Sequence, residues 1–324
     1  MEKFYFITHD ITTPAFNLAM EEYLLKQKDG YYVCLWRNSP AVIIGVNQNA
    51  FKEVNLAYTS ENGVDVIRRI TGGGAVYHDL NNLCYTVIAP YDQNENNFKK
   101  FTAPVIEYLA SLGITATLSG RNDITVMDKK ISGSAQTVYN DRVMHHGTLL
   151  FKTDVDALTN SLNPSKLKIE SKGISSVRSR VLNLSECLDK NTTVVDFMNN
   201  LEKFFLKTCE KIDLSEQDKL AINKLVKEKY STYEWNMGRS PKGKILFEEK
   251  FDFGILSISF DLDNALMKNV KIEGDFFSIK DVKGLEEQLE NCKFTYQALE
   301  EKLKNLDEFI VGAQCEQILS KIFL

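Results

Sequence analysis

Two arginines followed by three glycines form the part of this sequence best suited to bind an anion. Arg68 and Arg69 precede residues 72–74 in the stretch RRITGGGAVYHDL. Glycines reach positive φ angles and admit a ligand close to the backbone, and successive N–H groups form an anion-binding concavity. Arginines add forked donors for carboxylate or phosphate. We therefore expect an anion site formed by Arg68, Arg69 and the glycines at 72–74, with a purely structural turn as the alternative. Residues 69–75 are named the glycine turn below.

The spacing of these glycines differs from that of two common phosphate sites. Neither GxxxxGK[ST] nor GxGxxG occurs in the chain. These patterns mark P-loop nucleotide sites and dinucleotide-binding folds respectively. The sequence therefore disfavours a Walker-type NTPase and a Rossmann dehydrogenase.

A second polar stretch, GRNDITVMDKKISGSAQ, carries a candidate catalytic cation. It contains Asp123 and the pair Lys129 and Lys130. Side chains alternate across a strand, so only one lysine of the pair points to a given face. An inward lysine supplies a compact positive charge for an acyl or phosphoryl oxygen, and Asp123 is a candidate ligand for Mg²⁺ near phosphates. The alternatives are two solvated lysines and an aspartate that caps a turn.

Two further basic segments are candidates for contact with a ligand. His145 and His146 are adjacent on an expected strand, so their rings face opposite ways and a shared metal is disfavoured. The alternatives are one exposed and one packed histidine; we favour one ring that lines a pocket wall. Residues 171–184 contain three basic side chains and form either a solvated loop or a lid over an anionic ligand.

The elements expected to position these residues are of mixed type. Capping and periodicity predict a helix within residues 11–27, with Thr13 as cap and Pro14 in the first turn. Further helices are expected over residues 98–113, ending at Gly113, and over much of residues 192–230. Apolar and β-branched runs predict strands over residues 31–36, 41–45, 64–69, 74–79, 83–89, 116–139 and 142–151.

The chain changes character near WNMGRSPKGK, residues 235–244, which reads as a linker. Beyond it, residues 245–277 predict a small antiparallel sheet, and residues 281–292, 294–306 and 307–323 predict helices. We expect an α+β protein with a large catalytic domain, residues 1–240, and a small α+β accessory domain, residues 245–324.

Composition limits the class of protein. The 324 residues carry a formal net charge of −5, which disfavours a broad nucleic-acid surface. The six cysteines have no metal-ligand spacing and suggest reduced thiols. No secretory leader or membrane-length apolar run is evident, so a cytoplasmic protein without membrane contact is expected. A monomer is the default expectation.

Taken in order, several segments resemble the lipoate–protein ligases of the bacterial type. The matching stretches are FNLAMEEYLL, LWRNSPAVIIGVNQN, RRITGGGAVYHDLNNLCYTVI, SGRNDITV, KISGSAQ, HHGTLLF, LNPSK, KGISSVRSRVLNL and YEWNMG. They span the large domain and reach the domain junction. The resemblance implies a large mixed sheet like that of the biotin ligases, followed by an accessory domain.

The resemblance also implies a two-step reaction. Such enzymes activate lipoate with ATP and Mg²⁺ to lipoyl-AMP, release pyrophosphate, and transfer the lipoyl group to a lysine ε-amine. Acceptors are lipoyl domains of the E2 subunits of 2-oxoacid dehydrogenases and the glycine cleavage H protein. Whether octanoate also serves stays open, because small changes in an apolar tail alter binding by only ~1–3 kcal/mol.

By resemblance, specific residues take roles in this chemistry. Lys130, in KISGS, contacts both the lipoate carbonyl and the phosphate as an electrostatic stabiliser and not as a nucleophile. Val76 and His146 join it around lipoate, and Asp123 is the Mg²⁺ ligand. The expected ATP and lipoyl-AMP contacts are Arg69, Gly73, Gly74, Ala75, Val76, Tyr77 and Lys130.

Several alternatives remain open. Gln136 and Thr137 stand where some members of the family have an arginine. A lipoyltransferase that uses preformed lipoyl-AMP fits the sequence nearly as well. A cysteine-dependent octanoyl or lipoyl transferase is disfavoured, since no cysteine adjoins the Lys130 or His146 motifs. A biotin ligase or a non-catalytic binding module is disfavoured by the intact glycine turn and Lys130.

Overall fold

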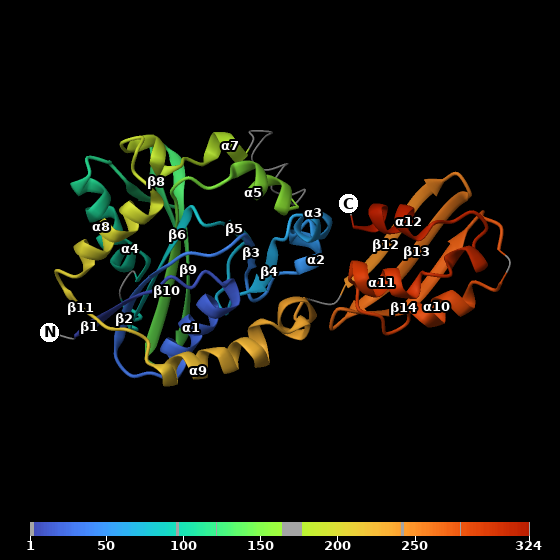
Figure 1. Cartoon of the computed structure of the whole chain (residues 1–324), viewed down its shortest axis with the longest axis horizontal. Helices are drawn as coiled ribbons and strands as arrows, with labels where there is room; N and C mark the ends of the chain where they lie inside the picture. Colours follow the sequence, from blue (N-terminus) through green and yellow to red (C-terminus); the bar gives the residue numbers. More distant parts are fainter. Residues whose placement is uncertain are drawn as a thin grey trace.

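The computed structural model of the chain describes residues 3–94, 97–120, 122–163, 177–240, 243–278 and 280–323. They form a large N-terminal part on a central mixed sheet and a smaller C-terminal domain with its own sheet (Figure 1). The predicted α+β class, with a large mixed sheet and a C-terminal accessory domain, is confirmed. The limits 1–240 and 245–324 stay a prediction.

The central sheet positions most of the polar motifs. Its eight described strands run in the order β11-β1-β2-β6-β10-β9-β8-β7. They are β1 (Phe4–Thr8), β2 (Tyr31–Trp36), β6 (Asn82–Pro90), β7 (Thr117–Ser119), β8 (Asp123–Val126), β9 (Lys129–Tyr139), β10 (Arg142–Leu150) and β11 (Cys209–Lys211). The pairs β1–β2 and β1–β11 are parallel, and the ladders from β2 to β7 are antiparallel.

Helix α1 (Pro14–Lys26) covers one face of this sheet. Pro14 occupies the first turn as predicted, but the Thr13 side chain makes no capping hydrogen bond. All residues from Pro14 to Leu25 are buried, so this helix lies within the core and does not present the usual solvent face. Helix α9 (Glu216–Leu225) and the π-helical turn η2 (Val226–Tyr230) pack against it.

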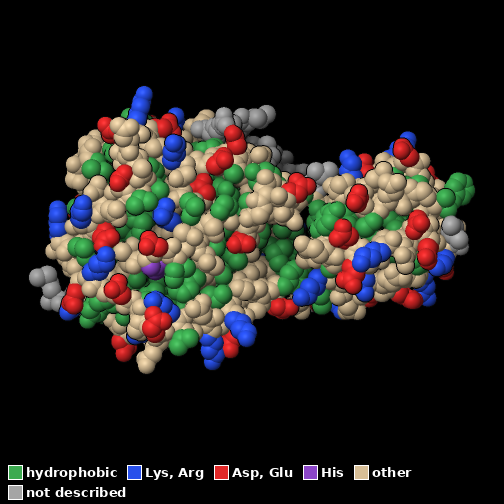
Figure 2. Space-filling view, in the orientation of Figure 1, with side chains coloured by type: hydrophobic (Ala, Val, Ile, Leu, Met, Phe, Trp, Pro, Cys, Tyr) green, Lys and Arg blue, Asp and Glu red, His purple; other side chains and the backbone are tan. Residues whose placement is uncertain are grey.

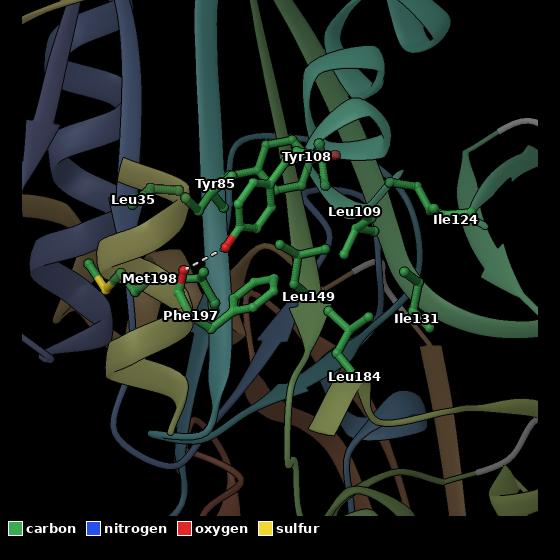
Figure 3. Close-up of a cluster of buried hydrophobic side chains, with 14 of the residues drawn as sticks. Leu35, Tyr85, Tyr108, Leu109, Ile124, Ile131, Leu149, Leu184, Phe197 and Met198 are labelled. Carbon is green, nitrogen blue, oxygen red and sulfur yellow. Dashed lines mark hydrogen bonds between the residues drawn. The ribbon is translucent and has the colours of Figure 1, made fainter. Parts of the chain in front are cut away.

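Helices α4 (Asn97–Ser111) and α8 (Val194–Phe205) cover the opposite face. Their apolar side chains meet those of β6, β9 and β10 in one cluster, part of which Figure 3 shows around Tyr85, Tyr108 and Phe197. The Tyr108 hydroxyl donates to the Phe197 carbonyl over 3.5 Å, which ties the two helices together. Helix α4 ends at Ser111, and Gly113 follows with a φ of 79°.

A second, smaller sheet packs on the face of the central sheet that α1 also covers. It consists of β4 (Asp65–Arg68), β3 (Ala41–Ile44) and β5 (Val76–His78) in that order. Its inner side chains join the α1 cluster, and its outer side chains form a separate apolar cluster. Three short helices lie beside it: α2 (Ala50–Glu53), α3 (Leu56–Glu61) and α5 (Val155–Ser161). Helix α7 (Val177–Arg180) contacts α5 and β9, and the 3₁₀ turn η1 (Leu184–Cys187) packs in the cluster with α4 and α8.

The C-terminal domain has the predicted three-stranded antiparallel sheet. It comprises β12 (Gly243–Phe251), β13 (Gly254–Asp263), β14 (Leu266–Gly274), α10 (Lys283–Leu289), α11 (Tyr296–Lys302), the 3₁₀ turn η4 (Leu306–Glu308) and α12 (Cys315–Ile322). These elements share a core of their own. The helix predicted over residues 307–323 begins only at Cys315, because Gly312 has a φ of 81° and the chain turns there.

Two connections differ in detail from what their composition suggested, although residues 192–230 are mainly helical, as expected. Residues 192–230 contain the edge strand β11 between two helices. Residues 231–240, which we name the connecting segment, are not a loose linker: the π-helical turn η3 (Glu234–Gly238) ends in buried residues, and Asn236 and Ser240 bond to β4. Polar and glycine-containing composition suggested exposure, but the polar groups of this segment satisfy buried partners.

The C-terminal domain contacts α2 and α3 of the large part. The rings of Phe51 and Phe294 lie 5.5 Å apart, and the Ala57 N–H donates to the Phe323 carbonyl over 3.2 Å. A hollow with apolar walls remains between the two lobes, visible near the centre of Figure 2. Within the ranges that the structure describes, no helix has the length and apolarity needed to cross a membrane.

Candidate active site

A cavity of about 240 Å³ lies between the glycine turn and one face of the central sheet. Gly73 and Gly74 form one edge of it, and Val76 continues that edge into β5. The floor comes from the central sheet and includes Lys130 and His146. The structure therefore brings together residues of four separate sequence motifs around one volume.

Strand register explains the shape of this cavity. Trp36 pairs with Cys84 and Cys84 with Thr148, while Gly133 lies beside Thr148 and pairs with Asp123. These five residues form one row on one face of the sheet. From Trp36 to Gly133 the row crosses three strand spacings, roughly 14 Å. The cavity thus runs across the strands, from an aromatic end at β2 to a charged end at β8 and β9.

The end at β2 is mostly apolar. Leu18 of α1, Trp36 of β2 and Ile43 of β3 line it. Trp36 is only 2% exposed, and its indole N–H donates to the Thr86 hydroxyl over 2.9 Å. This end suits an apolar group held without charge.

The opposite end carries Lys130. Its ammonium lies 2.8 Å from the Asp123 carboxylate, and each side chain is about a third exposed. Gly133 leaves the space for this pair, since a Cβ there would lie 2.8 Å from the Lys130 Nζ. Lys129 is exposed and does not line the cavity. The two lysine side chains therefore point to opposite sides of the strand, as expected.

Arg69 lines the cavity, but most of its N–H groups donate to groups of the glycine turn. Its Nη2 donates to the carbonyls of Gly72 and Gly74 over 2.6 and 2.8 Å, and its Nη1 to the Ile43 carbonyl over 2.9 Å. Its Nε donates to the Thr71 hydroxyl over 2.8 Å. Four of the five N–H groups of a guanidinium are therefore used. Burial lowers the pKa of Arg69 to about 10, so the group stays cationic at neutral pH.

Two other residues of this motif point away from the cavity. Arg68 is fully buried, and its guanidinium donates to backbone carbonyls and the Ser240 hydroxyl, so the expected contact with an anion is wrong for its side chain. The Tyr77 ring packs in the outer cluster of the small sheet. Only backbone groups of Tyr77 remain for the nucleotide contact expected there, which stays a prediction.

His146 belongs to a buried polar chain beneath the cavity. Its Nδ1 donates to the Glu21 carboxylate, with both oxygens at 3.0 Å, and its Nε2 lies 2.9 Å from the Thr71 hydroxyl. Thr71 in turn accepts from Arg69. The chain Glu21–His146–Thr71–Arg69 thus connects a carboxylate on α1 with the cation of the glycine turn, and it fixes the imidazole at the cavity wall.

His145 faces the other side of the sheet. It is fully buried among Tyr85, Phe98 and Phe101, and its Nδ1 lies 2.8 Å from the Gln136 amide nitrogen. Burial lowers its pKa to about 3, so the ring is neutral. One histidine of the pair lines the pocket, as we favoured, and neither is exposed.

Sequence reasoning missed a thiol in the cavity wall. Cys84 of β6 pairs with Thr148 of the neighbouring strand β10, and its Sγ is 3.6 Å from the His78 Nδ1. The cysteine thus adjoins the His146 motif in space, although not in sequence. Burial raises the pKa of the Cys84 thiol well above its usual value and lowers that of His78 to about 3. The pair is therefore a neutral thiol and a neutral imidazole, which gives no activated nucleophile.

The other missed residues had a detectable signal. Glu21 and Glu22 interrupt an apolar helix, and both are buried. Carboxylates are rarely fully buried without partners. Two adjacent glutamates at the centre of a core helix therefore indicate polar partners, although the sequence does not identify them.

No cluster of three or more His, Cys, Asp or Glu side chains suited to a metal occurs among the described residues. Asp123 is a single, partly exposed carboxylate beside Lys130. The basic stretch at residues 171–184 lies outside the described residues up to residue 176. From there α7 leads to Val181, which bridges to Lys130, and the Leu182 N–H donates to the Lys130 carbonyl over 2.9 Å.

Comparison with known proteins identifies the class. The family model for the lipoyl protein ligase A/B catalytic domain matches residues 13–206, and that for the bacterial lipoate protein ligase C-terminus matches residues 240–322. Lipoate–protein ligase 1 of Staphylococcus aureus is 43% identical over 92% of this chain and 93% of its own length. Lipoate-protein ligase LplJ of Bacillus subtilis is 40% identical over 97% and 98%. The chain belongs to the lipoate–protein ligase family.

Solved structures agree with this assignment. The bi-partite lipoate protein ligase of Thermoplasma acidophilum has a TM-score of 0.65 at 30% identity, over 75% of this chain and 98% of that one. A lipoate-protein ligase A bound with ATP has a TM-score of 0.63 at 29% identity, over 74% and 100%. LipL1 of P. falciparum in complex with lipoate covers 99% of both chains, with a TM-score of 0.62 at 28% identity.

Proposed function

We propose that this lipoate–protein ligase performs both half-reactions in the cavity beside the glycine turn. Lipoate and ATP give lipoyl-AMP and pyrophosphate, and lipoyl-AMP then acylates a lysine of an acceptor protein. The observation that carries the proposal is the polarity of the cavity. One end is apolar, at Trp36, and the other places Lys130 next to the glycine turn.

The apolar end suits the tail of lipoate. Leu18, Trp36 and Ile43 surround a volume into which only apolar groups fit without loss of hydrogen bonds. With the tail there, the carboxylate reaches toward Lys130. His146 and Val76 lie along the wall between the two ends. The complex of P. falciparum LipL1, a structural relative, with lipoate supports lipoate as the ligand.

Adenylation requires two anions to meet. A carboxylate oxygen of lipoate attacks the α-phosphorus of ATP, a new P–O bond forms, and pyrophosphate leaves. Lys130 offers its ammonium to the carbonyl and phosphate oxygens where charge develops, and preorganised charge of this kind lowers the barrier. For this contact, the ammonium exchanges Asp123 for the ligand. Arg69, Gly73, Gly74, Ala75, Val76 and the Tyr77 backbone complete the nucleotide contacts.

Asp123 is the residue that would hold Mg²⁺. A single partly exposed carboxylate fits an ion that keeps most of its waters and takes its other ligands from phosphates. When bound, the ion neutralises phosphate charge. Release of Lys130 from Asp123 then leaves a carboxylate oxygen free at the charged end of the cavity.

Transfer needs a neutral amine and a positioned anhydride. The acceptor lysine nitrogen attacks the lipoyl carbonyl carbon and loses a proton to water, an amide bond forms, and the acyl–oxygen bond breaks as AMP leaves. Lys130 stabilises the developing oxyanion and remains unmodified. The acceptors are lipoyl domains of E2 subunits or the glycine cleavage H protein, and the pairing of the Thermoplasma ligase with its E2 lipoyl domain supports this partner class. A monomer suffices, since one chain supplies all these residues.

The test is lipoate-dependent release of pyrophosphate from ATP by the purified protein, with Mg²⁺ and without acceptor. We expect a burst near one equivalent per enzyme with retained lipoyl-AMP. No release, together with transfer from supplied lipoyl-AMP to a lipoyl domain, would restrict the chain to the transferase half-reaction. Replacement of Cys84 by Ser separates the thiol-dependent alternative, since the ligase keeps its transfer activity without a cysteine nucleophile.

A further inference from the structure

Arg68 is a buried cation that the proposed reaction does not use. It is fully buried directly before the glycine turn, and no ion pair with it occurs among the described residues. A buried charge is costly unless its donors are satisfied. The Arg68 guanidinium donates hydrogen bonds only to neutral oxygens, and these belong to two segments of the chain. The identity of those segments suggests its role.

The first segment is the connecting segment to the C-terminal domain. Arg68 Nε and Nη2 donate to the Asn236 carbonyl over 3.2 and 2.9 Å, and Nη2 also donates to the Ser240 hydroxyl over 3.2 Å. The backbone of Arg68 is held as well. Its N–H donates to the Asn236 Oδ1 over 2.9 Å, and its carbonyl accepts the Trp235 indole N–H over 2.7 Å.

The second segment is the loop that supports the glycine turn. Arg68 Nη1 donates to the carbonyls of Gly45 and Gln48 over 2.9 and 2.6 Å. A Cβ at Gly45 would lie 2.2 Å from the Gly73 carbonyl oxygen, so this loop is packed directly against the turn. Gly73 lines the cavity. A shift of Arg68 therefore reaches the ligand site both along the chain and through this loop.

We propose that Arg68 is a positioning residue that holds the connecting segment against the glycine turn, so that ligand binding at the turn and the conformation of residues 234–240 are coupled. The inference rests on the proposed function only in that the glycine turn binds a ligand. Coupling of this kind is reciprocal: what stabilises one segment stabilises the other. The connecting segment is then a working part of the site and not a passive tether.

The test removes one bond between the two segments and keeps the rest. Trp235→Phe deletes the indole N–H that donates to the Arg68 carbonyl but keeps an aromatic ring beneath Lys229. Tyr233→Phe is the matched control, because it deletes a hydrogen bond from the same segment to the Ala265 carbonyl of the C-terminal domain. Lipoate-dependent pyrophosphate release is measured against ATP concentration, with the melting temperature of each variant.

We expect Trp235→Phe to raise the KM for ATP about fivefold at nearly unchanged kcat, as loss of one buried hydrogen bond implies. Tyr233→Phe leaves the KM within about twofold of the wild type. A uniform fall in both constants, or equal values for the two variants, would overturn the proposal. A structural defect alone lowers the amount of active enzyme and does not change its KM.

Amide hydrogen exchange provides a readout that does not depend on turnover. ATP with lipoate should slow exchange in residues 69–75 and also in residues 234–240 of the wild type, and Trp235→Phe should lose only the second effect. Protection confined to residues 69–75 in the wild type refutes the coupling and leaves the proposed function standing. Absence of protection in both segments refutes both.

Discussion

At the scale of single residues, Lys129 and Lys130 are the same residue type and differ in the direction in which their side chains point. Lys130 lies at the charged end of the cavity, and Lys129 is exposed to solvent. We expect Lys130→Ala to lower both lipoyl-AMP formation and transfer by about 10²–10³-fold, because it removes a donor aimed at developing charge. Single-turnover assays of each half-reaction measure this. Lys129→Ala is the control, and equal effects of the two changes would disprove the assignment.

Gly133 allows a second test of the same cation without touching it. A Cβ at this position would lie 2.8 Å from the Lys130 Nζ, so Gly133→Ala should push the ammonium away from its place beside Asp123. Because the flexible end of a side chain gives way, we expect little change in melting temperature but a loss of at least about tenfold in pyrophosphate release, or ~1.4 kcal/mol of barrier. A fully active Gly133→Ala enzyme would show that the position of Lys130 is unimportant.

The sequence indicated the residues of the site better than their partners. Motif residues singled out the glycine run, the Lys129–Lys130 pair and the His145–His146 pair, and the resemblance to the ligase family chose Lys130 and His146 from the two pairs. The contacts of Glu21 and Cys84 depend on strand register and helix packing over 125 and 64 residues of separation from His146 and Thr148 respectively, which no local pattern encodes. Arg68 was misjudged because a charged side chain beside a glycine run suggests a ligand, whereas its own carbonyl partners lie far along the chain.

At the scale of elements, Asp218 joins α9 to α1 and makes the fold sensitive to acid. Burial opposes its ionisation, but hydrogen bonds from Tyr23, Lys28 and Ser215 outweigh it and hold the pKa of the Asp218 carboxyl well below its usual value. The carboxylate therefore stabilises the fold at every pH above the unfolded pKa of about 3.9. This contribution is lost as the pH falls toward the folded pKa.

We expect Asp218→Asn to lower the melting temperature at pH 7 by roughly 3 °C or more. The difference from the wild type should be constant between about pH 5 and 8 and should shrink below about pH 4, where the native carboxylate also takes up a proton. Thermal melts across this range measure it. Glu216→Gln changes an exposed carboxylate of the same helix and serves as control; a difference that widens in acid would contradict the expected direction of the effect.

Most elements could be predicted from their own residues, and the exceptions have physical causes. Apolar runs such as residues 31–36 form strands, because a strand that is buried on both faces has apolar residues at nearly every position. β11 escaped notice because Cys209–Lys211 is short and polar, and only its pairing with β1 makes it a strand. The connecting segment looked like a linker because its buried partners belong to β4, more than 160 residues earlier.

At the scale of the whole molecule, the two lobes are joined by few contacts, and one aromatic pair is prominent among them. Phe51→Ala removes the ring that lies 5.5 Å from Phe294 and should cost roughly 1 kcal/mol of association between the lobes. We expect the C-terminal domain then to unfold in a separate, earlier transition by calorimetry. Phe277→Ala deletes a ring that is 80% exposed on the same domain and should leave the trace unchanged. A single unaltered transition for both variants would contradict this view.

The direction of the cavity has a consequence for the evolution of substrate length. A groove parallel to a strand can be extended one side chain at a time, whereas this one crosses β2, β6, β10 and β9. Its floor therefore changes only in whole increments of about 4.8 Å, the separation of neighbouring strands. Insertion of a strand would disrupt the sheet, so the fold permits only large changes in the length of the cavity. Finer selection between acyl groups therefore falls to the side chains at the apolar end, Leu18, Trp36 and Ile43.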